Sequence, residues 1–109
     1  MIRHISMFQM EPQPANGKTV EENQQLLVEF LEKLPEQEPS IVGCRIAPYA
    51  GQQPEVPEEA PVMFHQVVQM IDFAKPEDAA AYPASQAHQS LMAFTQGMVK
   101  KVAAIDFEI

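Results

Sequence analysis

The stretch VMFHQVVQMIDF, residues 62–73, is the longest strand candidate in the chain, and it carries apolar side chains on both faces. Side chains of a strand alternate between its two faces. One face then carries Met63, His65, Val67, Gln69, Ile71 and Phe73, and the other carries Val62, Phe64, Gln66, Val68, Met70 and Asp72. Neither set is polar enough to face water freely, so we expect both faces of the sheet that contains this strand to be covered.

Three further segments have the composition of strands. Residues 2–10 alternate loosely and end at the prolines that follow, which stop sheet pairing. Residues 40–50 and 101–109 are the other two candidates. In residues 2–10 both faces are again substantially apolar, and His4 shares one of them with Phe8.

Helix signals separate these strands. A capping-box pattern, TVEE at residues 19–22, opens a helix whose apolar residues recur at helical spacing as far as Leu34. Lys75 and the proline after it begin a short helix, which we expect to end at Tyr82 because a following proline disfavours helical geometry. Ser85 is a good N-cap for a third helix. The buried stripe of that helix is predicted as Ala87, Leu91, Phe94 and Met98, with His88 at its edge.

The element order is strand, helix, strand, strand, helices, strand. This order is typical of a single α+β domain over residues 1–109 with the ferredoxin-like, split βαβ arrangement: a four-stranded antiparallel sheet with helices on one face. One layer of helices leaves the second apolar face uncovered, and another copy of the chain is the simplest cover. We therefore predict a homodimer joined through sheet faces.

Composition excludes several classes of function. The net charge of −8 and the pI near 4.7 argue against partners with phosphate backbones and against anionic membrane surfaces, so neither nucleic acid nor membrane is expected. No apolar run approaches the roughly 20 residues of a membrane span, and no signal peptide is apparent. The single cysteine, Cys44, cannot form an internal disulfide, which fits the cytoplasm.

Residues 51–61 form a loop rich in proline and glutamate. The composition is unsuited to a helix or a central strand. A surface excursion between two strands is the favoured interpretation, and a rim or lid over a cavity is the alternative.

The common catalytic motifs are missing. The sequence has no phosphate-binding glycine loop, no H-E-x-x-H, no C-x-x-C and no G-x-S-x-G, and its serines, including Ser6, lack a nucleophile-elbow context. A dinucleotide, ATP or classical hydrolase site is therefore not expected. The three histidines do not pair at ligand spacing, so we expect neither a metal nor another cofactor.

The remaining reactive side chains are His4, His65, Tyr82 and His88. If His4 and His65 face the helices, all four could line one cavity between sheet and helices. Such a set suits proton abstraction next to a carbonyl, cyclisation, or oxygen chemistry on an activated substrate. The alternative is that the histidines are buried on backbone partners and that Tyr82 is a core aromatic. Apolar candidates for the cavity wall are Phe8, Phe30, Ile71 and Leu91.

Four short motifs in combination resemble the stress-responsive dimeric α/β-barrel (Dabb) family. They are IRHI at residues 2–5, FAKPE at residues 73–77, the pair Ala81-Tyr82 followed by His88, and IDFE at residues 105–108. The resemblance implies a ferredoxin-like monomer, a face-to-face dimer that forms a barrel, and a fold shared with antibiotic-biosynthesis monooxygenases.

The same resemblance implies site residues. One plant member of the family is a polyketide cyclase that uses a first-strand histidine, a helix tyrosine and a histidine six residues later, which match His4, Tyr82 and His88. This chain departs from the family pattern Tyr-x-x-His-Pro-x-His, because Ser85 and Gln86 replace the first histidine and the proline.

Three functions are consistent with these observations. The first is a small cytosolic homodimer that binds a small apolar or aromatic molecule in the cavity. The second is a cofactor-independent enzyme, cyclase-like or monooxygenase-like, that uses His4, Tyr82 and His88. The third is a purely structural role, which would need no cavity. A pocket of the roughly 300–1,000 Å³ typical of ligand sites would argue against the structural role.

Overall fold

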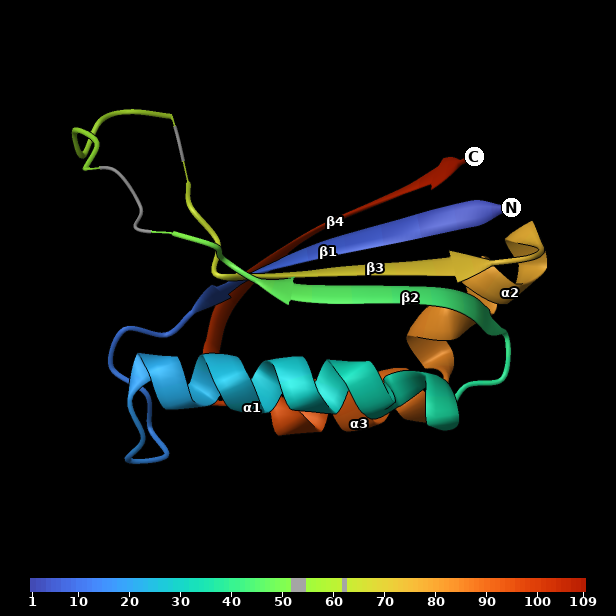
Figure 1. Cartoon of the computed structure of the whole chain (residues 1–109), viewed down its shortest axis with the longest axis horizontal. Coiled ribbons are helices and arrows are strands. Elements are labelled where there is room, and N and C mark those ends of the chain that lie inside the picture. Colours follow the sequence, from blue (N-terminus) through green and yellow to red (C-terminus); the bar gives the residue numbers. More distant parts are fainter. Residues whose placement is uncertain (52–54, 62) are drawn as a thin grey trace.

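The computed structural model describes residues 1–51, 55–61 and 63–109. In this part of the chain four strands form one antiparallel sheet in the order β2-β3-β1-β4 (Figure 1). The strands are β1 (Ile2–Met10), β2 (Ile41–Pro48), β3 (Val67–Phe73) and β4 (Val99–Glu108). The predicted α+β, ferredoxin-like arrangement is confirmed.

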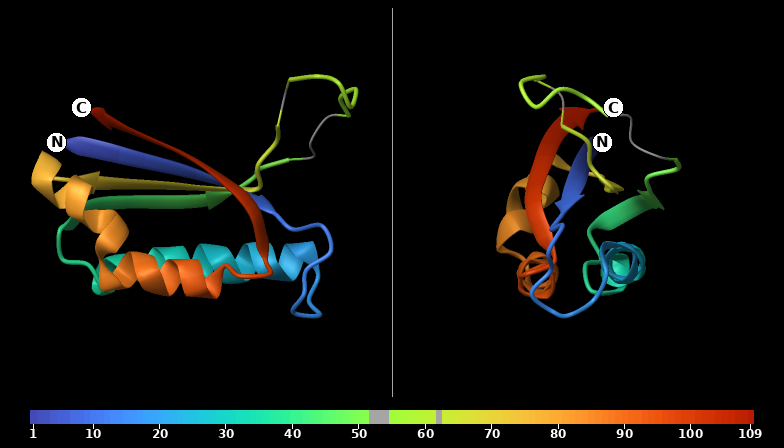
Figure 2. Two further views of the ribbon diagram at one scale, coloured as in Figure 1. Left: turned by 180° about the vertical axis from the view of Figure 1, so that it is seen from behind. Right: turned by 90° about the vertical axis from the view of Figure 1, so that its left-hand side faces the viewer.

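The helices lie on one side of this sheet. They are α1 (Val20–Lys33), α2 (Pro76–Ala81) and α3 (Gln86–Phe94), with the single 3-10 turns η1 (Leu34–Glu36) and η2 (Tyr82–Ala84). Figure 2 shows α1 and α3 side by side beneath the sheet, with β4 curving down toward α3. One face of the sheet is therefore covered by helices, and the other has no cover within the described chain.

Local capping signals set the starts of the two long helices. The Thr19 hydroxyl accepts from the Glu22 amide at 3.1 Å, and the Glu22 carboxylate accepts from the Thr19 amide at 3.0 Å, so the predicted capping box is confirmed. At α3 the Ser85 hydroxyl accepts from the His88 amide at 3.1 Å. These bonds satisfy amides that have no partner inside their own helices.

The core fills the space between the helices and the inner face of the sheet. Its members include residues that are fully or almost fully buried: Phe8, Phe73, Tyr82, Ile71, Leu27, Leu31, Leu34 and Leu91. Along β3 burial alternates at every second residue from Val67 to Phe73, and along β1 Ser6, Phe8 and Met10 are buried. The predicted division of faces is thus confirmed for both strands.

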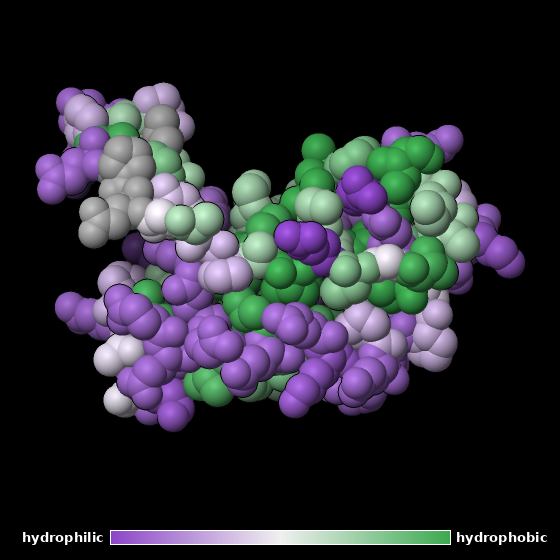
Figure 3. Space-filling view, in the orientation of Figure 1, coloured by the Kyte–Doolittle hydropathy of each residue, from purple (hydrophilic) through white to green (hydrophobic). Residues whose placement is uncertain are grey.

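The outer face of the sheet is apolar and uncovered. Ile5 pairs with Met70 on one side and with Ile105 on the other, so three large apolar residues cross the sheet in one row. Ile105 is 59% exposed and Phe107 39% exposed, which is unusual for neighbouring residues of this size. In Figure 3 the surface over α1 is mostly hydrophilic, whereas hydrophobic residues gather above it, over the strands.

The long strand predicted for residues 62–73 begins only at Val67 in the structure. Its neighbour β2 ends at Pro48, which pairs with Val67, and one further backbone bond, from the Tyr49 amide to the Gln66 carbonyl at 2.7 Å, closes the ladder. Just before Val67, the Gln66 side chain accepts from the Met10 amide at 2.8 Å, and the Gln66 backbone amide donates to the Phe8 carbonyl at 2.8 Å. The prediction that His65 lies on a core strand is therefore wrong; Val62 lies outside the described residues.

Other element boundaries differ less. β2 is shorter than the predicted 40–50, and β4 begins at Val99 rather than at residue 101. Helix α3 ends at Phe94, although Met98 beyond it is still buried as the apolar stripe predicted. Of the loop predicted over residues 51–61, residues 52–54 lie outside the described chain. Residues 55–61 extend away from the helices (Figure 1).

Candidate functional site

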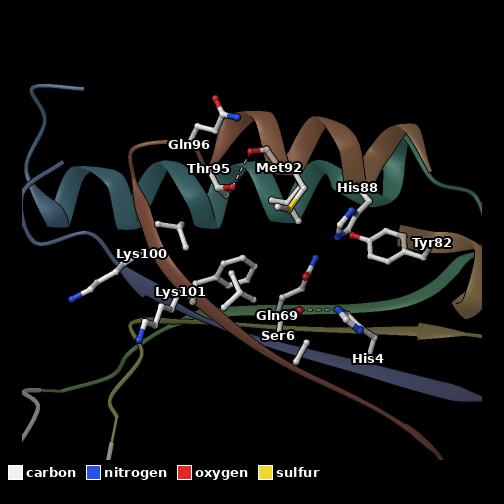
Figure 4. A pocket seen from close by; sticks show the side chains of 15 residues that line it. His4, Ser6, Gln69, Tyr82, His88, Met92, Thr95, Gln96, Lys100 and Lys101 are labelled. Atoms are coloured by element: carbon white, nitrogen blue, oxygen red, sulfur yellow. Dashed lines mark hydrogen bonds between the residues drawn. The ribbon is translucent and has the colours of Figure 1, made fainter. Parts of the chain in front are cut away.

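A cavity of about 540 Å³ lies between the inner face of the sheet and α3 (Figure 4). Its wall comes from β1, β3, β4, η2 and α3: His4, Ser6, Phe8, Gln69, Tyr82, His88, Leu91, Met92, Thr95, Gln96, Val99, Lys100, Lys101, Val102 and Ala104. The volume falls within the roughly 300–1,000 Å³ usual for sites that bind small molecules. None of residues 55–61 lines it, so this part of the loop is not a rim of the cavity.

His4 sits at the centre of a chain of three polar side chains. Its Nδ1 lies 2.5 Å from Asp106 Oδ1, and its Nε2 lies 2.7 Å from Ser6 Oγ. The sheet explains this arrangement, because His4 and Asp106 are direct partners across β1 and β4, and Ser6 is on the same face two residues along. A carboxylate only accepts, so the proton of the neutral tautomer is assigned to Nδ1, and Nε2 in that tautomer accepts from the Ser6 hydroxyl.

Tyr82 joins the two histidines of the cavity. Its ring lies edge-on to His4, with centroids 5.8 Å apart, and edge-on to His88, with centroids 5.2 Å apart. Burial raises the pKa of the Tyr82 phenol to about 12, and the nearby Gln69 amide offsets part of this effect. The phenol is therefore protonated at neutral pH and is available as a hydrogen-bond donor.

Two buried side chains present polar atoms that are not satisfied. Gln69 is 1% exposed and Tyr82 is 3% exposed. No hydrogen bond of normal geometry reaches the Gln69 amide or the Tyr82 hydroxyl among the residues that the structure describes, although the amide is near enough to lower the pKa of the phenol. A buried amide without a partner costs on the order of 1–3 kcal/mol, so this pair indicates a place where a polar group is bound.

His88 enters the cavity from the first turn of α3. The pKa of its imidazole is lowered, mainly by burial and also by the neighbouring His4. The ring is therefore neutral at pH 7 and can accept a proton or a hydrogen bond. Its position depends on the break at η2, because Pro83 ends the preceding helix and Ser85 caps the next.

The structure brings together some of the predicted site residues and separates others. His4, Tyr82, His88, Phe8 and Leu91 line the one cavity. The others do not line it: His65 borders a separate depression near Pro48 and Tyr49, Ile71 is fully buried in the core, and Phe30 stacks on Phe94 with centroids 4.2 Å apart.

Three residues of the site were not predicted from the sequence: Ser6 and Gln69, which line the cavity, and Asp106, which contacts His4. Gln69 had a usable signal, because it is a polar residue between Val67 and Ile71 on a face predicted to be buried. For Ser6 the signal was its place two residues from His4 on one strand face, and Asp106 had no signal that would link it to His4. The contact of Asp106 with His4 depends on the register between β1 and β4, which pairs residues 102 positions apart, whereas Ser6 lies two residues from His4 on the same face of β1.

Among residues 1–51, 55–61 and 63–109, no cluster of three or more histidine, cysteine, aspartate or glutamate side chains could hold a metal ion. In the same residues no helix combines the length and the apolar character needed to cross a bilayer.

Fold and cavity together define a ferredoxin-like α+β protein whose pocket, beneath the sheet, has polar side chains at one end. The family model of the stress-responsive A/B barrel domain (Dabb) matches residues 2–109, and the chain belongs to this family. No curated protein matches the sequence significantly.

Several solved structures share the fold. A dimeric ferredoxin-like protein of unknown function from Bacteroides fragilis is 17% identical, with a TM-score of 0.72 and coverage of 99% of this chain and 95% of that one. A similar dimeric protein of unknown function from Thermobifida fusca is 18% identical, with a TM-score of 0.71 and coverage of 99% and 90%. The hydroxynitrile lyase of Passiflora edulis is 13% identical, with a TM-score of 0.72 and coverage of 99% and 92%. At these identities the likeness concerns the fold.

Proposed function

We propose that this protein binds a small, largely apolar or aromatic molecule in the cavity between its sheet and α3. The observation that carries the proposal is the pair of unsatisfied groups, Gln69 and Tyr82, which face a cavity with mostly apolar walls. A ligand with an aromatic body and one carbonyl oxygen matches this arrangement. The body packs against Phe8 and Leu91, and the oxygen accepts from the Gln69 amide and the Tyr82 hydroxyl.

We further propose that two copies associate through the outer faces of their sheets. The row of exposed apolar residues that includes Ile105 supports this, as does the dimeric state described for the Bacteroides fragilis and Thermobifida fusca proteins. Interface and cavity lie on opposite faces of the sheet, so the partner subunit would leave the cavity unfilled.

A paired-ligand experiment tests the binding proposal. Naphthalene and 2-acetylnaphthalene share an aromatic body, and only the second has a carbonyl oxygen. We expect Gln69→Leu to weaken the binding of 2-acetylnaphthalene roughly tenfold, the equivalent of one hydrogen bond, and to leave the binding of naphthalene unchanged. Isothermal titration calorimetry measures both. Gln25→Leu is the matched control, because Gln25 is exposed on α1.

The proposal would be abandoned if neither naphthalene nor 2-acetylnaphthalene bound to the wild-type protein. Equal changes in the affinities for both ligands in Gln69→Leu would also contradict the proposed binding mode, because the Gln69 amide would then make no hydrogen bond to the carbonyl oxygen.

The second candidate function is a cofactor-independent enzyme in the same cavity. It is favoured by the presence of a neutral His88 next to a protonated Tyr82, 5.2 Å apart between ring centroids. His88 would abstract a proton next to a carbonyl while Tyr82 donates to the developing oxyanion. The Passiflora edulis enzyme supports this candidate as an example of catalysis on this fold.

Hydrogen–deuterium exchange of the ligand distinguishes the two functions. The methyl group of 2-acetylnaphthalene in D₂O gains deuterium if His88 removes a proton from it, and mass spectrometry of the recovered ligand detects this. We expect His88→Gln to abolish the exchange above background. Exchange at the uncatalysed rate with the wild-type protein would leave binding alone as the function.

A further inference from the structure

Ser6 has a role in neither proposed function, yet it is built into the cavity. Its side chain lines the wall, and the residue is 4% exposed. Its hydroxyl contacts His4 Nε2 at 2.7 Å, and the opposite ring nitrogen of His4 contacts Asp106. A hydroxyl, an imidazole and a carboxylate in this order form the arrangement that activates a serine, in which the ring accepts the hydroxyl proton and the carboxylate holds the ring in the required tautomer.

We propose that Ser6 is a nucleophile that accepts an acyl group from a small ester or thioester bound in the cavity. The inference rests on the proposed function in one respect, namely that the cavity admits a small molecule. It adds a reaction class and three residues with defined roles. Ser6 attacks, His4 transfers the proton, and Asp106 is the positioning residue that acts through His4.

Burial of the three side chains decreases from Ser6 through His4 to Asp106. Ser6 is almost fully buried, the His4 side chain is 17% exposed, and the Asp106 side chain is 51% exposed. The carboxylate is therefore solvated by water, whereas the hydroxyl faces a largely apolar space. A nucleophile in such a space is poorly solvated, and competing water is partly excluded from it.

Donors for the oxyanion lie beside the serine. Gln69 is the direct partner of Ser6 across β1 and β3, which places their Cβ atoms about 4.5–5.5 Å apart. Its amide group has no partner in the described chain, and neither does the Tyr82 hydroxyl. Backbone amides of a central strand are occupied by the ladder, so these two side chains would take the place of the usual backbone donors. Figure 4 shows Gln69, Ser6, His4 and Tyr82 at the same end of the cavity.

The reaction balances without any cofactor. Ser6 Oγ attacks the acyl carbonyl carbon while its proton passes to His4 Nε2. The bond from that carbon to the leaving oxygen or sulfur breaks, and the leaving group takes the proton from His4. Water then attacks the acyl-serine with His4 as base, which releases a carboxylic acid and restores the Ser6 hydroxyl.

Covalent labelling tests the assignment. The wild-type protein is incubated with p-nitrophenyl butyrate and, separately, with diisopropyl fluorophosphate, and the modified residue is located by peptide mass spectrometry. We expect a burst of p-nitrophenolate and modification at Ser6 with both reagents. Ser6→Ala abolishes both signals, and the matched control Ser90→Ala, on α3 outside the cavity, preserves them. Modification confined to Lys100 or Lys101 overturns the proposal.

Asp106 needs a measurement that a purely structural role would not affect. We expect Asp106→Asn to slow acylation of Ser6 at least roughly tenfold and to change its pH profile, because the amide favours the wrong tautomer of His4. Asp106→Glu partly restores the rate. An unchanged rate and profile in Asp106→Asn overturn the assigned role of the relay.

Binding of naphthalene to the same protein samples separates the two proposals. Naphthalene binding without modification of Ser6 overturns the nucleophile and leaves the binding function intact. If naphthalene does not bind and Ser6 is not modified, the binding function and the nucleophile are both overturned. Should Ser6→Ala fail to fold, as judged by circular dichroism, the site mapped on the wild-type protein decides the question by itself.

Discussion

Gln69 shows how a single side chain can be costly to the fold and useful to a site. Its amide lies on the inner face of β3 between two fully or almost fully buried apolar residues, Val67 and Ile71, and no described residue satisfies it. A leucine of similar size would fill the same space without a polar group to desolvate. Proteins keep such a residue where it meets a bound group.

The first prediction follows from this cost. We expect Gln69→Leu to raise the free energy of unfolding by about 1 kcal/mol, because it removes an unsatisfied buried amide. Urea denaturation at a fixed protein concentration measures this, with the exposed Gln25→Leu as control. A loss of stability would show that the amide is already satisfied in the free protein, for example by an ordered water.

The second prediction concerns His88, whose pKa is lowered in the folded state by burial and by His4. In the unfolded chain the imidazole has its ordinary pKa near 6.5, so the unfolded state takes up a proton first as the pH falls. The contribution of His88 to stability is thus complete above about pH 6.5 and is lost as the pH falls from there through the lower folded pKa.

We therefore expect the wild-type protein to lose more of its free energy of unfolding than His88→Gln when the pH falls from about 7.5 to about 5.5. Urea denaturation at the two pH values measures the difference between the proteins. The same loss in both would mean that His88 titrates alike in the folded and unfolded states.

At the scale of elements, the break between α2 and α3 positions the site. Pro83 and Ser85 set it through local geometry, which is why the sequence alone predicted it. The start of β3 was not predictable in the same way, because it depends on where Pro48 ends the neighbouring strand and on the bond from Met10 to Gln66. The contact of Asp106 with His4 is likewise set by the register between β1 and β4.

The third prediction belongs to this break. Ser85→Ala removes the bond to the His88 amide and is expected to lower the free energy of unfolding by about 1 kcal/mol. It also loosens the first turn of α3, so affinity for 2-acetylnaphthalene should fall. Ser85→Asp supplies another capping oxygen and should retain both properties. Equal losses in the two variants would show that the hydroxyl acts in some way other than as a cap.

At the scale of the whole molecule, the uncovered face of the sheet was the most informative feature of the sequence. Two-faced apolar strands predicted both the helix layer and the need for a second cover, and the structure shows Ile105 and Phe107 exposed where that cover is missing. The charged pair on this face is internally satisfied. Arg3 donates two hydrogen bonds to Asp72 at 2.9 and 3.1 Å, and the guanidinium lowers the pKa of that carboxyl.

The fourth prediction tests the proposed interface. We expect Ile105→Asp to convert the dimer to a folded monomer, because it would bury an unpaired carboxylate between two apolar faces. Sedimentation velocity at micromolar concentration measures the mass. Ala93→Asp adds the same charge on the exposed side of α3 and should remain dimeric. A monomeric wild-type protein, or a dimeric Ile105→Asp, would rule out this interface.

Strand β1 separates the cavity from the outer face by the thickness of one backbone. His4 and Ser6 point to the cavity, and Ile5 between them points to the face where a second copy would dock. A shift of this strand cannot change one side without the other. The proposed ligand binding and the proposed subunit association would therefore be linked equilibria. If dimer formation changes the ligand affinity of each site by a given factor, saturation with that ligand changes the association constant of the two subunits by the square of the same factor, because the dimer has two sites.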